Sequence, residues 1–559
     1  MAFWSRLRQA ETLMTLDTRE PARRPIFAWL YDAPDLLVIV VWAALIFCAA
    51  CLRVNFIGDG VRHLTPILTQ SPPALGEPRW LLFPVFVFTI VKPVQMAGLV
   101  HSAKDAARVF LALDYFAGIA YLLLLRQWLI YKSISPRSRA AALLLAGVTV
   151  PMLHFSSDIV EVMVPATIAL AGLVYLASQP PEDASKGLYV AATAIAIATL
   201  LYQGIILAVA LVPCAIARDA RIRQRSLILF CAILAVAPLL MLTTLVATGA
   251  SPHTAIHLML TGEENVLFRN LMASHRLPLW QRPFAAISIG AATSIIQLPD
   301  NLGLRQGIRL LLHSTTFLEG VFNILGRLLA LAIVFIGAAA IVRRRDWRIA
   351  VALAGLLVLP VLRGYAYLKY YTLMPIVIAL VASVSPPAIV LGAGGIVAAF
   401  NLTYLARDIA RDRQLAHDIA PLFASANNSA CWLTTGWGAP IFGWPGSVCS
   451  MSQVLSAADT DQVDAMIAEN NQKLTGSFRR CFCNSSAVYT DDVTLATQER
   501  AANLASHFRF TGVDLNELLW NPSRGAIAFE RDGIVTYTYS RPVQSEICDK
   551  LMTSTKTSH

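Results

Sequence analysis

Charged residues are scarce in this chain. They make up 14% of its 559 residues, against about 25% in a typical soluble domain. Hydrophobic residues make up 56%, so a soluble protein of this length would lack the polar side chains needed to cover its surface. An ordinary soluble enzyme is therefore excluded. A disordered chain is excluded too, because disorder goes with low apolar content. The composition predicts a polytopic membrane protein.

The N-terminus lacks the apolar core of a cleavable signal peptide. Residues 1–34 contain several arginines, and no small-residue cleavage site follows the first long apolar run at 36–52. We therefore expect this run to be retained as the first membrane span. Residues 1–34 are then a cytoplasmic N-terminal segment.

A membrane-spanning helix needs about 20 mostly apolar residues. About eleven segments qualify: 35–53, 109–130, 139–154, 162–178, 187–201, 203–217, 226–247, 318–342, 348–363, 371–386 and 387–404. Two further apolar runs, 80–100 and 283–297, are ambiguous. Pro84 and Pro93 favour a broken segment along the outer interface over a crossing at 80–100.

Basic clusters indicate which side of the membrane each loop faces, because cytoplasmic loops are enriched in lysine and arginine. If 80–100 does not cross, the clusters at 126–139, 218–225 and 343–348 all fall on the cytoplasmic side. The same assignment gives long outer loops at 54–108 and 248–317. It also explains most of the net charge of +10, so no nucleic-acid partner is required.

The composition changes after residue 404. Residues 405–559 are polar, with alternating stretches typical of strands at 526–530 and 534–539 and helical patterns at 406–424 and 491–508. Five cysteines lie in this region, which indicates one or two disulfides in an oxidising compartment, with the pairing open. We predict a small extracytoplasmic α+β domain at 405–559, after a transmembrane domain at 35–404.

Ionisable residues near membrane depth are candidates for function, because charge is costly there. Asp59 lies between two glycines directly after the first span, where it either caps a turn or acts as a general base above the membrane. Asp158 and Glu161 are three residues apart, so a helix would place both on one face. They form either a negative outer loop or a site for substrate hydroxyls or a divalent cation such as Mg²⁺ or Mn²⁺.

A basic and aromatic segment precedes the tenth predicted span. Arg363, Tyr365 and Lys369 lie on a predicted outer loop, where membrane topology does not require cations. The segment is either an interfacial aromatic belt or a clamp for a phosphate group. Three residues of the second long outer loop are further candidates for that clamp: His253, His257 and Arg269.

This layout resembles the GT-C superfamily of membrane glycosyltransferases that use polyprenyl-phosphate sugars, of the lipid A aminoarabinose transferase and protein O-mannosyltransferase type. Asp59 directly after the first span, the long outer loop, the paired short spans, the segment at 363–371 and the C-terminal domain carry the resemblance. In the family the acid after the first span is commonly part of an acidic pair, whereas Gly60 follows Asp59 here.

The resemblance implies a sugar transfer with inversion from a polyprenyl-phosphate donor to a lipid, glycan or protein acceptor of the envelope. The reaction would occur at the outer face of a bacterial inner membrane, with the C-terminal domain periplasmic and shaping access of the acceptor. Asp59 would deprotonate the acceptor hydroxyl. Lys369 and Arg363 would stabilise the departing phosphate, and Asp158 and Glu161 would orient sugar hydroxyls or a cation.

Other classes of membrane protein remain open. An O-antigen-type polysaccharide polymerase or ligase would use the loop 248–317, which contains several arginines and histidines. A lipid or solute transporter or flippase would need polar residues at mid-membrane, and the predicted spans are clean of central charges, which argues against it. A simple membrane anchor would not need eleven spans.

Overall fold

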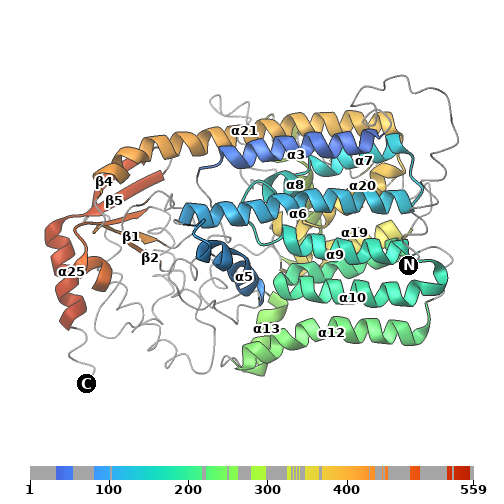
Figure 1. The fold of residues 1–559 in the computed structure, drawn as a ribbon, viewed down its shortest axis with the longest axis horizontal. Helices are drawn as coiled ribbons and strands as arrows, with labels where there is room; N and C mark the ends of the chain where they lie inside the picture. The colour runs from blue at the N-terminus through green and yellow to red at the C-terminus, as the bar shows by residue number, and fades with distance from the viewer. Residues whose placement is uncertain are drawn as a thin grey trace.

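The computed structural model is a bundle of apolar helices with a small β-sheet at one end (Figure 1). It describes residues 33–54, 64, 81–100, 103–216, 222–247, 251–261, 278–297, 347–363, 368–426, 429–434, 444, 447–450, 479–491, 525–531 and 534–553, with isolated positions between 321 and 339.

Five of the described helices are long and apolar enough to cross a membrane. They lie in α3 (Pro34–Leu52), α6 (Ala103–Tyr131), α10 (Ala184–Leu201) with the preceding turn η1 (Pro181–Asp183), α12 (Gln224–Ala247) and α21 (Pro387–Ser425). Large apolar side chains point outward from them, such as Val40 of α3 and Leu239 of α12, which are 51% and 58% exposed. Such surfaces suit lipid and not water. The chain is therefore a polytopic helical membrane protein, and the number of eleven crossings stays a prediction.

Shorter helices fill the space between these five. They are α5 (Phe83–Met96), α7 (Pro136–Gly147), α8 (Val150–Phe155), α9 (Met163–Ser178), η2 (Gln203–Leu211), α11 (Val212–Ala215), α13 (Pro252–Thr261), η3 (Leu279–Gln281), α15 (Arg282–Ala285), η4 (Ala286–Ala291), α16 (Ala292–Ile295), α19 (Trp347–Arg363), η5 (Leu368–Tyr371) and α20 (Met374–Ser383). The predicted span 139–154 is thus two helices, with the break at Val148–Thr149 just before Pro151. α5 lies within the ambiguous run 80–100 and is about 21 Å long, shorter than the hydrocarbon core of about 30 Å.

Small residues allow the central helices to approach closely. α9 packs along both α6 and α10. A Cβ on Gly172 of α9 would meet the Cβ of Ala194 at 2.6 Å, so a larger residue there would push α10 away. On α6, Gly118 leaves room for Ser156, which lies in the loop after α8. The close approach at Gly118 places that loop against α6.

α3 defines the two ends of the bundle, and we name them after its flanking charges. At the Asp35 end, the buried Asp35 carboxylate accepts hydrogen bonds from Arg126 Nε at 2.9 Å and Arg139 Nε at 2.8 Å. At the same end, by the alternation of the helices, Arg348 donates to the carbonyl of Ile216 at 3.0 Å. The Asp35 end therefore holds residues from the basic clusters that the sequence assigns to the cytoplasm.

α21 runs from the bundle to the sheet as a single helix of 39 residues. The predicted segments 387–404 and 406–424 join in it because no glycine or proline lies between 396 and 420. The predicted boundary at 404/405 falls inside this helix. Figure 1 shows α21 beside α3 and continuing beyond it toward the sheet.

The sheet has five strands in the order β2-β1-β3-β5-β4. They are β1 (Cys431–Thr434), β2 (Ser447–Ser450), β3 (Val488–Asp491), β4 (Gly525–Arg531) and β5 (Ile534–Tyr539), and helix α25 (Arg541–Thr553) follows them. β1 is parallel to β2 and β3, whereas β5 is antiparallel to β3 and β4. The strands predicted at 526–530 and 534–539 are confirmed as β4 and β5, and the helix predicted at 491–508 lies outside the described residues.

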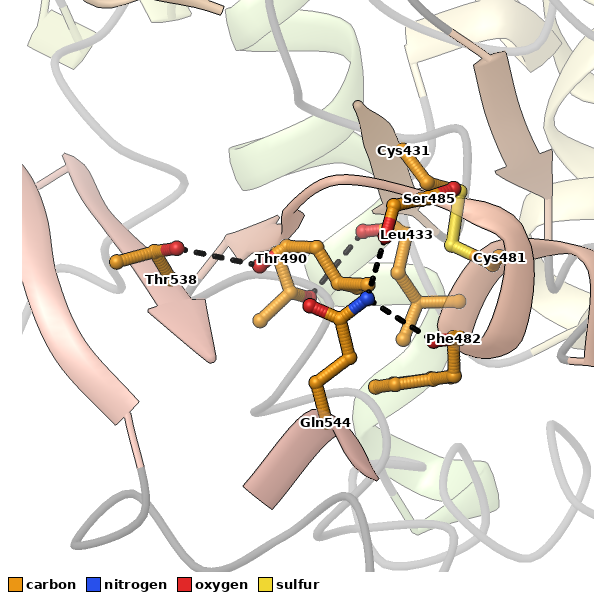
Figure 2. The surroundings of a disulfide bond; sticks show 9 residues. Cys431, Leu433, Cys481, Phe482, Ser485, Thr490, Thr538 and Gln544 are labelled. Carbon is orange, nitrogen blue, oxygen red and sulfur yellow. Dashed lines mark hydrogen bonds between the residues drawn. A yellow bond between two sulfur atoms is a disulfide. The ribbon is translucent and has the colours of Figure 1, made fainter. Parts of the chain in front are cut away.

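Two disulfides hold the sheet region together, which confirms the prediction of one or two such bonds. Cys431 of β1 pairs with Cys481, and Cys483 pairs with Cys548 of α25. Figure 2 shows the first of them beside Gln544, whose amide donates to the carbonyls of Phe482 at 2.9 Å and Ser485 at 2.7 Å. Both disulfides and these hydrogen bonds attach the short segment 479–486 to its neighbours.

An aromatic cluster joins α21 to the sheet. Phe423 of α21 meets Trp432 of β1 and Trp444 edge to face, with ring centroids 5.8 and 5.5 Å apart. Tyr489 of β3 packs against both tryptophans. Aromatic pairs of this geometry stabilise beyond the area they bury, by about 0.5–1.5 kcal/mol. The sheet is thus docked on the end of α21 by packing as well as by chain connectivity.

Candidate functional site

Lys369 and Glu161 form an ion pair at the Arg53 end of the bundle, the end at which Arg53 follows α3. Glu161 lies in the loop between α8 and α9, and Lys369 lies in the 3₁₀ turn η5 before α20. The Nζ of Lys369 lies 2.6 Å from Oε1 of Glu161, whose side chain is fully buried, whereas that of Lys369 is 24% exposed. The buried Glu161 carboxylate therefore binds the Lys369 ammonium group on its inner side, while part of the lysine side chain stays exposed. The structure thus brings together two predicted site residues that are 208 positions apart.

Asp158 lies in the same loop and faces Arg53, the residue that ends α3. Its Oδ2 is 3.6 Å from Arg53 Nη1, and both side chains are buried. Arg53 also contacts Asp408 of α21 at 3.2 Å, and the next backbone N–H, of Val54, donates to Asp412 at 2.9 Å. The end of α3 is thus attached to both the acidic loop and α21.

The charge of Arg53 is secured by its neighbours. Burial alone would lower its pKa, but the carboxylates of Asp158, Asp408 and Asp412 outweigh burial and raise the pKa above its usual value. A permanently charged guanidinium therefore separates Asp158 from Asp408. In the sequence, Asp59 follows Val54 by five residues.

Asp114 is a third acid in the cluster, and the sequence analysis did not single it out. It is the twelfth residue of α6 and is fully buried. Its Oδ2 accepts the backbone N–H of Val160 at 3.0 Å, and among the described residues its Oδ1 has no hydrogen-bond partner. The carboxylates of Glu161 and Asp158 act on it electrostatically. Asp114 lies near the start of the predicted span 109–130, so it is a charge within that span but not at its centre.

The position of Asp114 is explained by a local contact. Asp114 faces the loop 158–161, which folds back against α6, so its acid belongs to the cluster at the Arg53 end and not to an isolated midplane site. The available signal was a lone aspartate in the otherwise uncharged stretch 109–125. Within the part of the chain that is described, the acids here outnumber the bases. Such a cluster can accept a proton or orient the hydroxyl groups of a substrate.

Metal binding stays a prediction. Among the described residues, no group of three or more histidine, cysteine or acidic side chains is placed to hold a metal ion.

A cavity of 200 Å³ lies next to this cluster. Its lining comes from α8, the end of α16 and α21, and includes His154, Gln297, Tyr404 and Asp408. Asp408 is the residue that also contacts Arg53, so the cavity and the acidic cluster share a wall. None of the polar residues of α21 was predicted as part of a site.

The remaining predicted site residues are not brought to the cluster by the described structure. Asp59, Arg269 and Tyr365 lie outside the described residues. Arg363 is the last residue of α19 and His257 lies in α13, but their side chains are not described. His253 is exposed on α13, which packs against α12, and it makes no hydrogen bond or ion pair with the described residues.

Comparisons with known proteins give a structural similarity only. No protein-family model and no curated protein matches the chain. It is similar to the crystal structure of ArnT from Cupriavidus metallidurans bound to undecaprenyl phosphate, with a TM-score of 0.47 and 13% identity, over 93% of this chain and 99% of that chain. The apo crystal structure of the same protein gives a TM-score of 0.39 and 14% identity, over 91% of this chain and 98% of that one. A similarity at this level leaves the function to be argued from the site.

Proposed function

We propose that the protein is a membrane glycosyltransferase of the GT-C type. It moves a sugar from a polyprenyl-phosphate donor, undecaprenyl in a bacterium, to a hydroxyl of a lipid, glycan or protein acceptor. The observation that carries this proposal is the meeting of Asp158, Glu161 and Lys369 at one end of a lipid-facing bundle. A donor with a lipid tail and a charged head needs both features, because the tail stays in the membrane while the head reaches polar groups.

The proposed reaction forms one bond and breaks one. Asp59 takes the proton of the acceptor hydroxyl, whose oxygen bonds to the anomeric carbon as the bond from that carbon to the phosphate oxygen breaks. The polyprenyl phosphate leaves with the electron pair, and the sugar inverts. Lys369, held in place by Glu161, faces the surface and stabilises the negative charge of the leaving phosphate. Arg363, Tyr365, His253, His257 and Arg269 are proposed to assist in binding the donor.

Asp158 is proposed to orient the sugar hydroxyl groups, since Arg53 fixes its side chain at the point where α3 ends. A divalent cation, Mg²⁺ or Mn²⁺, would serve the same acids if one is bound. A polymerase or ligase that relied on loop 248–317 would bring histidines of that loop to the site. No contact in the described structure brings His253 there, so transfer at the acidic cluster is the better supported proposal.

The proposed membrane orientation follows from the two ends of the bundle. Disulfides persist in oxidising compartments, and both belong to the sheet region beyond the Arg53 end. Arg126, Arg139 and Arg348 lie at the opposite end, which the positive-inside rule assigns to the cytoplasm. We propose an inner-membrane protein with a cytoplasmic N-terminus and a periplasmic C-terminal domain.

The test is a transfer assay with the full chain in lipid nanodiscs. The donors are undecaprenyl phosphates carrying single labelled sugars, and the acceptors are extracted envelope lipids, glycans and proteins. We expect transfer by the wild type and loss of about 10²–10⁴-fold in Asp59→Asn, the usual contribution of a general base. Melting temperature checks that the variant is folded. The proposal is wrong if no polyprenyl-phosphate sugar is a donor, and the role of Asp59 is wrong if Asp59→Asn keeps near-normal activity.

A further inference from the structure

The cavity between α8, the end of α16 and α21 is large for a packing defect. Its volume is 200 Å³, whereas a single buried water needs about 10–15 Å³ of such space. It therefore has room for a small organic group. Its place beside the acidic cluster makes the chemistry of its walls informative.

The walls divide into an apolar side and a polar side. Val150, Leu153 and Leu405 supply the apolar side, and His154 and Gln297 contribute to the polar side. The imidazole of His154 and the side-chain amide of Gln297 make no hydrogen bond with the described residues. A pyranose or furanose ring has the same division, with C–H groups on its face and hydroxyl groups on its edge. The cavity is thus complementary to a polyhydroxylated ring.

Asn401 fixes the shape of the cavity without taking part in binding. Its Nδ2 donates to the carbonyls of Val148 at 2.6 Å and Ile295 at 2.8 Å, and its Oδ1 accepts the backbone N–H of Gln297 at 2.8 Å. These three bonds join α21 to the break between α7 and α8 and to the end of α16. Both polar atoms of the Asn401 side chain are thus bonded to backbone groups, which holds this wall of the cavity in one arrangement. A preformed wall of this kind is what a binding pocket needs and what a loose packing fault lacks.

The cavity is linked directly to the acidic cluster. Asp408 lines it and contacts Arg53 at 3.2 Å, and Arg53 in turn lies 3.6 Å from Asp158. Two side chains therefore separate the cavity from the acid proposed to orient sugar hydroxyl groups. A sugar held in the cavity would lie next to the place of transfer.

We infer that this cavity binds one sugar unit of a substrate, an inference that rests on the proposed function. The shared chemistry is a polyhydroxylated ring, and it has two sources, the sugar of the polyprenyl-phosphate donor or a sugar of the acceptor. His154 and Gln297 hydrogen-bond the hydroxyl groups, and Leu153 and Leu405 pack against the ring. The two sources predict different kinetic effects when the cavity is altered.

Two variants alter the cavity and one serves as a matched control. Leu405→Trp fills the cavity from α21. Gln297→Leu removes the amide but keeps the backbone N–H that bonds to Asn401, so the wall should stay in place. Leu391→Trp makes the same change in size on α21 at a side chain that is 44% exposed on the apolar surface.

The experiment measures transfer kinetics against donor and acceptor separately, using undecaprenyl-phosphate-linked sugars that serve the wild type. We expect Leu405→Trp to raise KM for one substrate by about tenfold or more, and Gln297→Leu by about three- to tenfold, the effect of one lost hydrogen bond. A rise for the donor identifies the donor sugar, and a rise for the acceptor identifies the acceptor sugar. Leu391→Trp should stay within about twofold of the wild type.

Binding of bare undecaprenyl phosphate is the second measurement, and it should be unchanged in both cavity variants because it carries no sugar. The inference is overturned if both cavity variants keep wild-type KM for donor and acceptor, or if kcat falls alone. If Leu405→Trp fails to fold by melting temperature, Gln297→Leu decides. A wild type that transfers no sugar would refute the proposed function itself, which is a separate result from normal transfer with insensitive variants.

Discussion

The two ends of the helical bundle both hold buried charge, but they use it differently. At the Asp35 end, one buried carboxylate lies between two guanidinium groups at 2.9 and 2.8 Å, so its charge is fully matched. At the Arg53 end, Asp114, Asp158 and Glu161 share a small volume with Arg53 and Lys369. The acids there exceed the bases among the described residues, and a cavity adjoins them.

Under the proposed function, the difference separates charge that stabilises the fold from charge that takes part in the reaction. A carboxylate held by two cations has little left to offer a substrate, and its removal would leave buried positive charge. An acidic cluster with an oxygen that lacks a partner in the described structure keeps the capacity to bind or move a proton. Changes at the Arg53 end should therefore affect transfer first, and changes at the Asp35 end should affect folding first.

The largest effect is expected at Lys369. Lys369→Met removes the cation that we propose stabilises the leaving phosphate, and transfer should fall about 10²–10³-fold, as on losing a preorganised group that stabilises developing charge. The matched change at the other end, Arg139→Met, should leave kcat within about twofold. Steady-state transfer kinetics of both variants check this. Equal losses in the two would mean that the two ends do not differ in role.

Asp35→Leu should be the most destabilising single change at the Asp35 end. It leaves Arg126 and Arg139 without their buried carboxylate, and we expect a loss of about 3 kcal/mol, the lower end for a broken buried pair, since both arginines are partly exposed. Thermal unfolding in nanodiscs measures it, with Asp35→Asn as the control that keeps a hydrogen-bond acceptor. Unchanged melting of Asp35→Leu would show that this ion pair does not stabilise the bundle.

Asp114 tests whether the Arg53 end depends on position as well as on charge. Asp114→Asn keeps an oxygen that can accept the Val160 N–H, whereas Asp114→Leu does not. Because the bond holds the loop that carries Asp158 and Glu161, we expect kcat to fall about tenfold in Asp114→Leu and less than about threefold in Asp114→Asn. KM for donor should change little. If both variants lose activity equally, the acid itself is needed and the positioning role is wrong.

The smallest effect is expected for Arg348. Arg348→Met removes its hydrogen bond to the Ile216 carbonyl, worth about 1 kcal/mol. The melting temperature should fall slightly while transfer kinetics stay unchanged. A clear loss of activity would show that the Asp35 end communicates with the site, which would weaken the contrast between the ends.

Charged residues of the candidate site could be predicted from the sequence because charge is scarce in this chain. Asp158, Glu161 and Lys369 stood out because few charged residues lie near the predicted outer ends of the spans, and the structure places them together. Strands β4 and β5 and the disulfide-forming region were predictable from local alternation and cysteine clustering, whereas β1, β2 and β3 were not predicted. Local patterns of this kind need no knowledge of distant partners.

The parts that were not predicted depend on contacts between distant segments. Asn401 and Gln297 are ordinary amides in the sequence, and the hydrogen bonds of Asn401, including the one to Gln297, reach partners 104 or more residues away. Asp114 sits inside a span because a loop folds back to meet it. The break at 148–149 was hidden because both halves are apolar. Residue type and spacing alone do not encode such pairings.

The length of α21 determines how far the sheet lies from the helical bundle. At 1.5 Å per residue its 39 residues extend about 58 Å, roughly twice the hydrocarbon thickness of a bilayer. Asp408, the twenty-second residue, is about 32 Å from the start, so about one hydrocarbon thickness of helix precedes its pair with Arg53. The remaining turns continue as helix to Ser425 and meet the sheet. In the proposed orientation these turns carry the sheet beyond the membrane, so the proposed acceptor would have to reach the site through the space between the sheet and the bundle.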